Sequence, residues 1–600
     1  MVFFINIIGY IALSIVIASY LDKELVVIQP ISIAILLLNL LVLATFRVLS
    51  FITFVLLIYF IILLYLIYKK KIKIEFITSK VLSVSFISLI ISLVLIYFFA
   101  RDRIPYAWDE LGAWALEVKT LYFNNGFSQP YMHTTIGYGD YLPGQMLFEW
   151  WFVNFDNKSF NEGLMYVGYY AFYIINLSHF FIIEQNDKHS IFKWMFGIVK
   201  CLAIKLVLLY IPSLISGNVY EMLQVEFLQT CIIANVLIFI NNCNETHNNK
   251  FGTIYWFSNM FVLLLLKDSS IVFIVILTLF YIISSHIKKE KRIIKNKYLL
   301  FSLMINAIVY TLWKVFCGIN HRGTSYSRVT NILDRIKILI MNTDSDANKY
   351  IHSFFNSLIY QPIRGNLKYS INLVFPIFII LLVVFLILVY RNQTIQTKLK
   401  LVLCYVFMIA IYLLVILAMH IFSFRETQYF DPRVMMLSIS RYGEPLLLGI
   451  LIFIFYEFIR SNNYVFNLFF LLIVLLSGSI TTVHYGFIGY RKGLNELINY
   501  RSNFEYKYEK LINDINTFTN GKKQCRIFFV YDDEVQNSRL YQYYLAPTAI
   551  YMHKSFSGID SLILNYKNDN KCEYVYFDSL KDSKFNVKEK QLYEIKDLKD

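Results

Sequence analysis

Charged residues are scarce in this 600-residue chain. Asp, Glu, Lys and Arg make up 16% of it and hydrophobic residues 57%, with a mean hydropathy of +0.54. Average soluble domains are about 25% charged. The apolar residues form blocks long enough for a bilayer core, which needs about 20 residues as helix, and lipid offers unpaired backbone groups no partner. The composition excludes an ordinary soluble protein and predicts a polytopic α-helical membrane protein.

Signals for several other classes are also missing. The first apolar block, FFINIIGYIALSIVIASY, lacks the basic n-region and small-residue cleavage site of a signal peptide, so we expect a retained span. The seven cysteines form no metal-like cluster. The net charge of +15 does not indicate a nucleic-acid partner, because many basic residues lie in short loops between apolar blocks, where they orient the chain.

The apolar blocks predict about fourteen transmembrane helices. They lie at residues 2–20, 27–45, 49–68, 79–100, 164–183, 194–215, 223–241, 251–266, 269–285, 298–317, 371–390, 401–423, 444–460 and 464–485. We divide the chain into N-terminal accessory helices at 1–78, a transmembrane core at 79–485, and a connector with a small extracytoplasmic domain at 486–600.

Loop charge predicts the orientation. Three loops rich in Lys and Arg fall on one side in this count, at 69–75, 288–297 and 391–400. Such loops are typical of the cytoplasmic face. Four segments then fall on the opposite, external side, at 101–163, 318–370, 424–443 and from about 486 to the end.

The external tail has the pattern of a small α/β domain. CRIFFVYDD (525–533) and CEYVYFDSL (572–580) are strand-like runs, and the patterns between them are helical and mixed. A polar helical connector is expected at 486–518, and no Gly-rich phosphate loop appears. Cys525 and Cys572 begin the two runs and could pair if the tail is outside the cell.

An acidic pair follows one of the apolar blocks. In RDRIPYAWDELGAWALEVKTLYFNNGF (101–127), Asp109 and Glu110 precede a helical pattern. Asp109 alone could be a helix cap. Helical periodicity, however, puts Glu110, Trp114 and Glu117 on one face. Carboxylates accept hydrogen bonds from hydroxyls and indoles stack on sugar rings, so this face favours a sugar-like acceptor.

This layout resembles the GT-C superfamily of membrane glycosyltransferases. The resemblance rests on YAWDELGAWALEVKTLY and on GYGDYLPGQMLFEWWF (137–152), and it is to the bacterial cell-surface polysaccharide type. It covers residues 79–600 in organisation more than in identity, and the three spans before residue 79 depart from the superfamily's usual layout. It implies a polyprenyl-phosphate sugar donor and a glycan, teichoic acid or lipid acceptor at the outer face of the cell membrane.

The resemblance also implies roles for individual residues. Asp109 would be the general base, which an inverting transfer from a sugar phosphate requires opposite the leaving group. Glu110 would position the acceptor or a divalent cation. A divalent cation is the one cofactor that the acidic pair could bind. The other residues expected to bind substrate are Trp108, Trp114, Glu117, Asp140, Lys267, Arg425 and Arg441.

Plainer interpretations stand beside these roles. Asp140 suits a turn, and Lys267 suits a lysine that extends from a helix end to the membrane surface. Other functions also fit a protein with many spans: a polysaccharide polymerase or ligase, a lipid-linked sugar transporter or flippase, or a scaffold. A transporter has no need of an external acidic helix or a folded tail, and a polymerase is expected to rely on Arg- and His-rich loops. The acidic signal therefore favours a glycosyltransferase.

Overall fold

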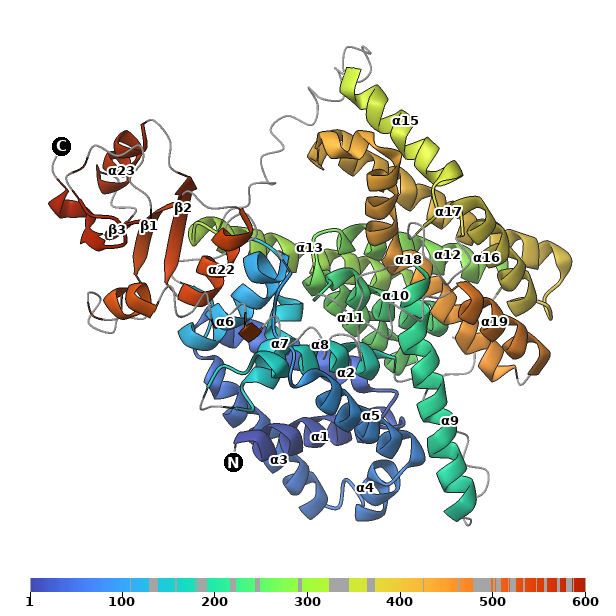
Figure 1. The fold of residues 1–600 in the computed structure, drawn as a ribbon. Coiled ribbons are helices and arrows are strands. Elements are labelled where there is room, and N and C mark those ends of the chain that lie inside the picture. The colour runs from blue at the N-terminus through green and yellow to red at the C-terminus, as the bar shows by residue number, and fades with distance from the viewer. Residues whose placement is uncertain are drawn as a thin grey trace.

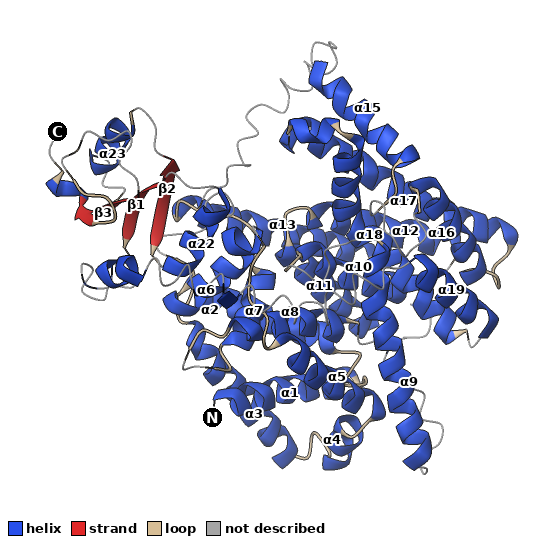
Figure 2. Ribbon diagram, in the orientation of Figure 1, coloured by secondary structure: helices blue, strands red, loops and turns tan. Residues whose placement is uncertain are grey.

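The computed structural model describes most of the chain. The described residues are 2–107, 109–128, 139–156, 159–177, 180, 191–215, 223–242, 249–289, 294–322, 345–363, 373–424, 426–461, 464–477, 498–499, 502, 509–515, 517, 525–531, 535–546, 548–554, 558–568, 572–578, 585 and 587–598. Figure 2 shows a large helical body with one small sheet beside it. The connector predicted at 486–518 lies largely outside the described residues.

Helices account for nearly all of the body. Their bounds are α1 (Val2–Leu21), α2 (Gln29–Thr45), α3 (Ile52–Tyr68), α4 (Ile74–Val81), α5 (Val84–Ala100), α6 (Ala115–Asn124), α7 (Gly144–Val153), α8 (Glu162–Asn176), α9 (Ile191–Tyr210), α10 (Val225–Asn242), α11 (Asn249–Leu266), α12 (Ser270–Ile287), α13 (Asn296–Ile319), α15 (Ser345–Tyr360), α16 (Phe375–Val389), α17 (Ile395–Met419), α18 (Pro432–Arg460) and α19 (Tyr464–Ser477). Single π-helical turns occupy Glu110–Trp114 and His420–Phe424.

Several of these helices are suited to cross a membrane. Among the described residues, seven are long and apolar enough: α1, the Leu49–Tyr68 helix, α10, α12, α13, the Ile395–Phe424 helix and α18. The bent pair α4 and α5 makes an eighth if it counts as one span, and α2, α16 and the helix Lys250–Leu266 are apolar but shorter. The protein is therefore polytopic and helical, as predicted, while the count of about fourteen spans stays a prediction.

The helix ends gather at two opposite ends of the body. At one end the contacts include Lys250 with the Tyr20 ring, Lys288 with Asn241, and Asn242 with Glu457. At the other end they include Arg47 with the Phe127 carbonyl, Arg322 with Glu117, and Arg441 with Asp109. The chain thus runs back and forth between a first end, near the predicted loop 288–297, and a second end, near the predicted loop 101–163 (Figure 1).

Two predicted boundaries are wrong. The span predicted at 79–100 is broken: α5 begins after Ser83, whose hydroxyl caps the helix by accepting the Phe86 N–H at 3.2 Å, and α4 meets α5 at 52°. The segment 424–443, predicted as a loop, is helical from Pro432 onward. The apolar block predicted a start at 444, but α18 begins at Pro432 and continues through Pro445, as helices packed inside membrane proteins often do.

The C-terminal residues form the predicted small α/β domain. Its described strands are β1 (Arg526–Tyr531), β2 (Ala549–Lys554), β3 (Tyr574–Phe577) and β4 (Leu592–Glu594), in the order β2-β1-β3-β4. The β1 strand pairs in parallel with β2 and β3, and β4 is antiparallel to β3. The β2 strand falls where the sequence pattern was mixed. Two helices complete the domain, α22 (Val535–Leu545) and α23 (Ile559–Asn568). Cys525 and Cys572 are both buried and form no disulfide with each other.

The small domain lies against the helix that follows the acidic pair. Figure 1 shows α22 next to α6. The Lys119 ammonium donates to the Tyr543 carbonyl at 2.7 Å, and the Tyr543 hydroxyl donates to Glu162 Oε1 at 2.7 Å. The Arg539 side chain packs over Gly112 so closely that a Cβ at that glycine would lie 3.0 Å from it. Residues more than 400 positions apart thus form one interface.

Candidate functional site

The acidic pair lies where the predicted helix begins. After α5, the chain passes through residues 101–107 into the π-helical turn Glu110–Trp114 and then α6. Asp109 occupies the position before this turn, yet among the described residues its side chain makes no capping hydrogen bond. The helix ends at Asn124, and the next residue, Asn125, adopts a left-handed conformation with φ of 55°. The carboxylate of Asp109 is therefore left for another partner.

That partner is Arg441 on α18. The Arg441 Nη2 donates to Asp109 Oδ2 at 3.0 Å, and its Nε lies 3.7 Å from Glu226 Oε1. The Lys267 Nζ, at the C-terminal end of α11, lies 2.5 Å from the same Glu226 oxygen. We call Asp109, Arg441, Glu226 and Lys267 the ion-pair network. It joins four parts of the chain at the second end of the body.

Part of the ion-pair network is exposed and part of it is buried. The side chains of Asp109 and Arg441 are 27% and 30% exposed, whereas that of Glu226 is 2% exposed. Glu226 Oε2 is buried and has no hydrogen-bond partner among the described residues. A buried carboxylate oxygen without a donor is costly, so Glu226 Oε2 is an unsatisfied acceptor within the network.

Aromatic rings flank the two cations. The Arg441 guanidinium lies 5.9 Å from the ring of the buried Trp114 and 5.9 Å from that of Tyr442. The Lys267 ammonium lies 5.1 Å from the same Tyr442 ring. Such cation–π contacts hold a charged group in place without neutralising it. Arg441 and Lys267 are therefore fixed cations next to an exposed carboxylate.

Glu110 faces away from this network, into the protein. Its side chain is fully buried and accepts hydrogen bonds from the Tyr166 hydroxyl at 2.7 Å and the Leu223 N–H at 2.9 Å. The N–H groups of Tyr106 and Ala107 donate to its other oxygen at 3.2 and 3.1 Å. These four donors tie the loop after α5 to α8 and to the start of α10. Glu110 is therefore placed to position these segments.

Burial changes the proton affinity of Glu110. Desolvation raises the pKa of its carboxyl from 4.5 to about 7, against the hydrogen bonds, which lower it. Glu149 on α7 lies close enough to interact with it, and burial together with the Glu110 charge raises the pKa of Glu149 well above its usual value. Two carboxyls behind the exposed Asp109 thus hold protons more readily than ordinary glutamates do.

Glu117 and Asp140 belong to separate ion pairs. Glu117 Oε1 lies 2.5 Å from Arg322 Nη2, and both side chains are buried. Arg322 belongs to the segment 318–370 that the loop charges place outside. Its side chain also donates to the Gly139 carbonyl at 2.9 Å and so anchors the segment before Asp140. Glu110 and Glu117 therefore do not form one exposed acidic face with Trp114.

Asp140 shares a lysine with a second acid. The Lys314 Nζ on α13 lies 2.9 Å from Asp140 Oδ2 and 3.2 Å from Asp268 Oδ2. The Trp313 indole N–H donates to the Asp140 carbonyl at 2.9 Å. Because Asp268 directly follows Lys267, this cluster lies beside the ion-pair network. The predicted Trp108 and Arg425 lie outside the described residues.

Sequence reasoning missed Glu226, the residue that connects the two cations. It is the second residue of α10, in VEFLQTCIIANVLIFI, where the rest of the first two turns is apolar or neutral. An ionisable side chain inside an apolar span is a functional candidate by default. By this rule the sequence alone marks Glu226 as a candidate. Its two basic partners, Arg441 and Lys267, are identified by the structure.

The donor set does not fit a divalent cation. Asp109 and Glu226 each face a cationic side chain, and Glu110 already accepts from four donors. Hard cations such as Mg²⁺ and Ca²⁺ need several carboxylate or carbonyl oxygens directed at one point. Among the described residues no group of three or more His, Cys, Asp or Glu side chains is so arranged.

Comparison with protein families, with curated proteins and with solved structures finds no match for this chain.

Proposed function

We propose that the protein is a GT-C-like membrane glycosyltransferase that transfers a sugar from a polyprenyl-phosphate donor to a glycan, teichoic acid or lipid acceptor. The observation that carries the proposal is the ion-pair network: a partly exposed carboxylate, Asp109, lies 3.0 Å from the cation of Arg441, and Glu226 connects Arg441 to a second cation, Lys267. A glycosyl transfer from a phosphate needs this pair of charges, a base for the acceptor and cations for the leaving group.

The reaction follows from these charges. The acceptor hydroxyl oxygen attacks the anomeric carbon of the donor sugar, and the bond from that carbon to the phosphate oxygen breaks. The electron pair of the broken bond stays with the polyprenyl phosphate, which Arg441 and Lys267 stabilise by charge-assisted hydrogen bonds. The hydroxyl proton passes to the Asp109 carboxylate. Attack opposite the leaving group inverts the anomeric configuration.

Substrate binding has to open the contact between Asp109 and Arg441. Both side chains are partly exposed, so a donor phosphate can take the place of Asp109 at Arg441 and free the carboxylate for the acceptor. Glu226 keeps Arg441 and Lys267 together while this happens, because it touches both. Its second oxygen, buried without a described partner, suits a sugar hydroxyl.

We place the site and the C-terminal α/β domain on the extracytoplasmic face of the cell membrane. The support is charge: the segments KKKIKIE (69–75) and RNQTIQTKLK (391–400) carry the basic excess typical of cytoplasmic loops. The helices next to them meet at the first end of the body, opposite the ion-pair network. On this orientation the roughly fourteen predicted spans alternate between the two faces, with membrane lipids around them.

The test is transfer by the purified protein from a panel of polyprenyl-phosphate sugars to a lipid or glycan acceptor. With the donor that works, Asp109→Asn should lower turnover by about 10²–10⁴-fold, the usual contribution of a general base. Asp102→Asn is the matched control, because Asp102 lies in the same loop with a side chain 52% exposed. Wild-type turnover in Asp109→Asn would contradict the proposed base.

The same purified protein distinguishes the proposed function from the alternative functions. Reconstituted in vesicles that carry a lipid-linked sugar on the inner leaflet, a transporter would expose that sugar outside without forming a new glycosidic bond. A polymerase or ligase would instead join or transfer whole glycan chains. Either result, with no single-sugar transfer from any donor of the panel, would contradict the proposal.

A further inference from the structure

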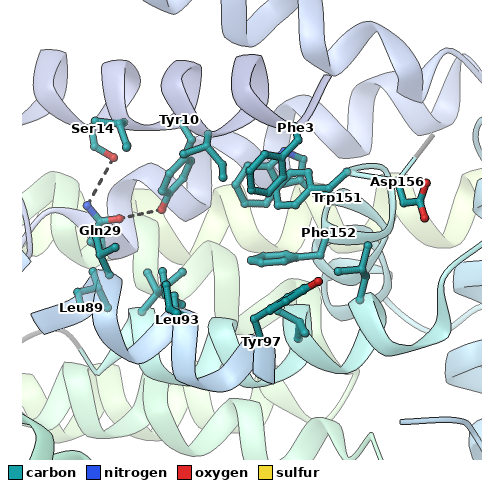
Figure 3. Close-up of a pocket in the computed structure, with 18 of the residues that line it drawn as sticks. Phe3, Tyr10, Ser14, Gln29, Leu89, Leu93, Tyr97, Trp151, Phe152 and Asp156 are labelled. Atoms are coloured by element: carbon teal, nitrogen blue, oxygen red, sulfur yellow. Dashed lines mark hydrogen bonds between the residues drawn. The ribbon is translucent and has the colours of Figure 1, made fainter. Parts of the chain in front are cut away.

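An elongated groove lies among the N-terminal helices, apart from the ion-pair network. It has a volume of about 570 Å³ and is lined by residues of α1, α5, α7 and α8. That volume falls in the range of about 300–1,000 Å³ that is usual for small-molecule sites. Figure 3 shows aliphatic and aromatic side chains along its length, including Leu89, Leu93 and Phe152. The lining is suited to hydrocarbon.

The groove runs along the helices. In Figure 3, Ser14, Gln29 and Leu89 lie at one end, and Phe3, Tyr97 and Asp156 lie at the other. On α5 the lining extends from Phe86 to Phe98, which at the helical rise is roughly 18 Å. One leaflet has about half of the roughly 30 Å hydrocarbon core of a bilayer. The groove therefore has the direction and the length of one lipid chain in one leaflet.

The inner end of the groove offers no free polar group to a ligand. The Tyr10 hydroxyl donates to Gln29 Oε1 at 2.9 Å, and the Gln29 amide donates to the Leu25 carbonyl at 2.7 Å and to Ser14 Oγ at 3.5 Å. These described polar side chains satisfy one another and close the end of the groove (Figure 3). A polar or charged ligand would lose its hydration there without compensation. The end of a hydrocarbon chain loses nothing.

The groove is open along its side, at the surface of the helical body. Four α5 residues that line it are exposed, Ile90 (38%), Val94 (48%), Tyr97 (41%) and Phe98 (50%). In a membrane this surface faces lipid, so a chain can enter sideways from the bilayer. A water-soluble ligand has no such route.

The cationic side chain of Arg101 lies at the outer end of the groove. The Arg101 guanidinium lies 5.8 Å from the Tyr97 ring and 5.3 Å from the Phe98 ring, and both rings line the groove. Its side chain is 45% exposed, and its Nε forms an ion pair of 3.7 Å with Asp102, whose side chain is 52% exposed. Exposed pairs of this kind are weak, so a lipid phosphate can replace Asp102. An arginine held at the membrane surface in this way is suited to a lipid phosphate.

We infer that this groove binds one acyl chain of an anionic phospholipid, with the lipid phosphate at Arg101. The inference goes beyond the proposed reaction and does not depend on it, since its residues are distinct from those of the ion-pair network. A polyprenyl chain is much longer than the groove and would extend far outside it. A phospholipid bound here would fix α1 against α5 and α7, and so hold the accessory helices on the core.

The test uses the full chain in phosphatidylcholine vesicles that contain a trace of phosphatidylglycerol with a photoreactive group near the end of one acyl chain. After irradiation, the attachment sites are mapped by peptide mass spectrometry. We expect them on the lining residues of α1, α5 and α7. Leu93→Trp fills the groove and should abolish this labelling, while the matched Leu95→Trp, on an outward position 44% exposed, should retain it.

A second pair of measurements tests the head group. Arg101→Gln should reduce labelling by the phosphatidylglycerol probe roughly tenfold, the loss expected for one charge-assisted hydrogen bond, and leave labelling by a diacylglycerol probe, which has no phosphate, unchanged. If Leu93→Trp does not fold, as judged by thermal unfolding, Leu93→Phe takes its place. Uniform labelling of all exposed helices, or equal labelling in both tryptophan variants, would overturn the inference. Complete displacement by polyprenyl phosphate would overturn it too, because the groove would then hold a prenyl chain.

Discussion

The surroundings of Asp109 indicate that its carboxylate contributes more to activity than to stability. The carboxylate makes no capping hydrogen bond among the described residues, and its contact with Arg441 is partly exposed. A capping role would contribute about 0.5–2 kcal/mol to stability, whereas exposed ion pairs contribute about 0–1 kcal/mol. Substitutions at this site should therefore change activity far more than the free energy of unfolding.

The two cations of the network give the first residue-level prediction. Arg441→Ala and Lys267→Ala should each weaken apparent donor affinity, because a lost charge-assisted hydrogen bond costs about 1.5–3 kcal/mol. Arg433→Ala is the matched control, since Arg433 is an exposed arginine at the start of the same helix. The measurement is the donor concentration dependence of sugar transfer. Unchanged values in both network variants would make these residues ordinary cations at a membrane edge.

Glu110 gives a prediction about pH. Its folded pKa is raised from 4.5 to about 7, so between these values the folded protein binds more protons at this site than the unfolded chain does. Stability from this group is complete below about pH 4.5 and falls as pH rises through about 7, by at most about 1.4 kcal/mol per pH unit. Glu110→Gln removes this dependence. The difference in unfolding free energy between wild type and the variant should therefore fall across this range.

The measurement is thermal or denaturant unfolding of both proteins at a series of pH values in one detergent. Glu149 is present in both proteins, so only the part of its raised pKa that comes from the Glu110 charge enters the difference. Parallel pH profiles would show that Glu110 does not titrate in this range. A difference that grows with rising pH would reverse the sign and contradict the buried, protonated carboxyl.

At the scale of elements, the interface between α22 and α6 makes a prediction for the small domain. The Tyr543 hydroxyl donates to Glu162, and Lys119 donates to the carbonyls of Tyr543 and Tyr544. Tyr543→Phe removes only the hydroxyl, whose bond to a carboxylate is worth about 1.5–3 kcal/mol. The domain should then separate more readily from the helix behind Asp109. We expect faster limited proteolysis between the two parts and lower sugar transfer.

Tyr593→Phe is the control for this variant. Tyr593 lies on β4 and its hydroxyl donates to Gln591 Oε1 within the same domain, away from α22. It should leave both proteolysis and transfer unchanged. Faster proteolysis of Tyr543→Phe with full activity would show that the docking of the small domain does not position the Asp109 helix.

The elements also show how far sequence reasoning reached. Period and composition predicted most helices and the α/β tail, because bilayer length and strand alternation leave clear patterns. The start of α18 was missed, since Gly443 and Pro445 are helix breakers in water, while Asp431 caps the helix well before them with a bond of 2.9 Å to the Arg433 N–H. That error placed Arg441 before a helix when it lies within one.

Site residues were harder to predict than elements. Asp109, Arg441 and Lys267 were selected from their positions at helix ends, and the structure brings them together through Glu226. Their pairing could not be deduced, because it depends on how four distant segments pack. For the same reason the buried pair of Arg322 with Glu117 could not be predicted.

At the scale of the whole molecule, the two ends of the body differ in charge and in content. The small α/β domain and α15 lie toward the second end, whereas the basic segments 69–75 and 391–400 lie toward the first (Figure 1). The ion-pair network also belongs to the second end, since Asp109 directly precedes the turn that leads into α6. Loops rich in Lys and Arg stay in the cytoplasm. The arrangement therefore predicts which end faces outward, and single cysteines can test it.

Thr427 and Asn392 are exposed at the second and first ends, respectively. In intact cells, a membrane-impermeant maleimide should label Thr427→Cys, while Asn392→Cys should react only after the membrane is permeabilised. The parent chain is the control for background, and its described cysteines are buried or half-buried. The reverse pattern would invert the orientation and put Asp109 in the cytoplasm. A donor phosphate would then have to reach Arg441 from the inner leaflet, and the proposed transfer to an external acceptor could not occur at this site.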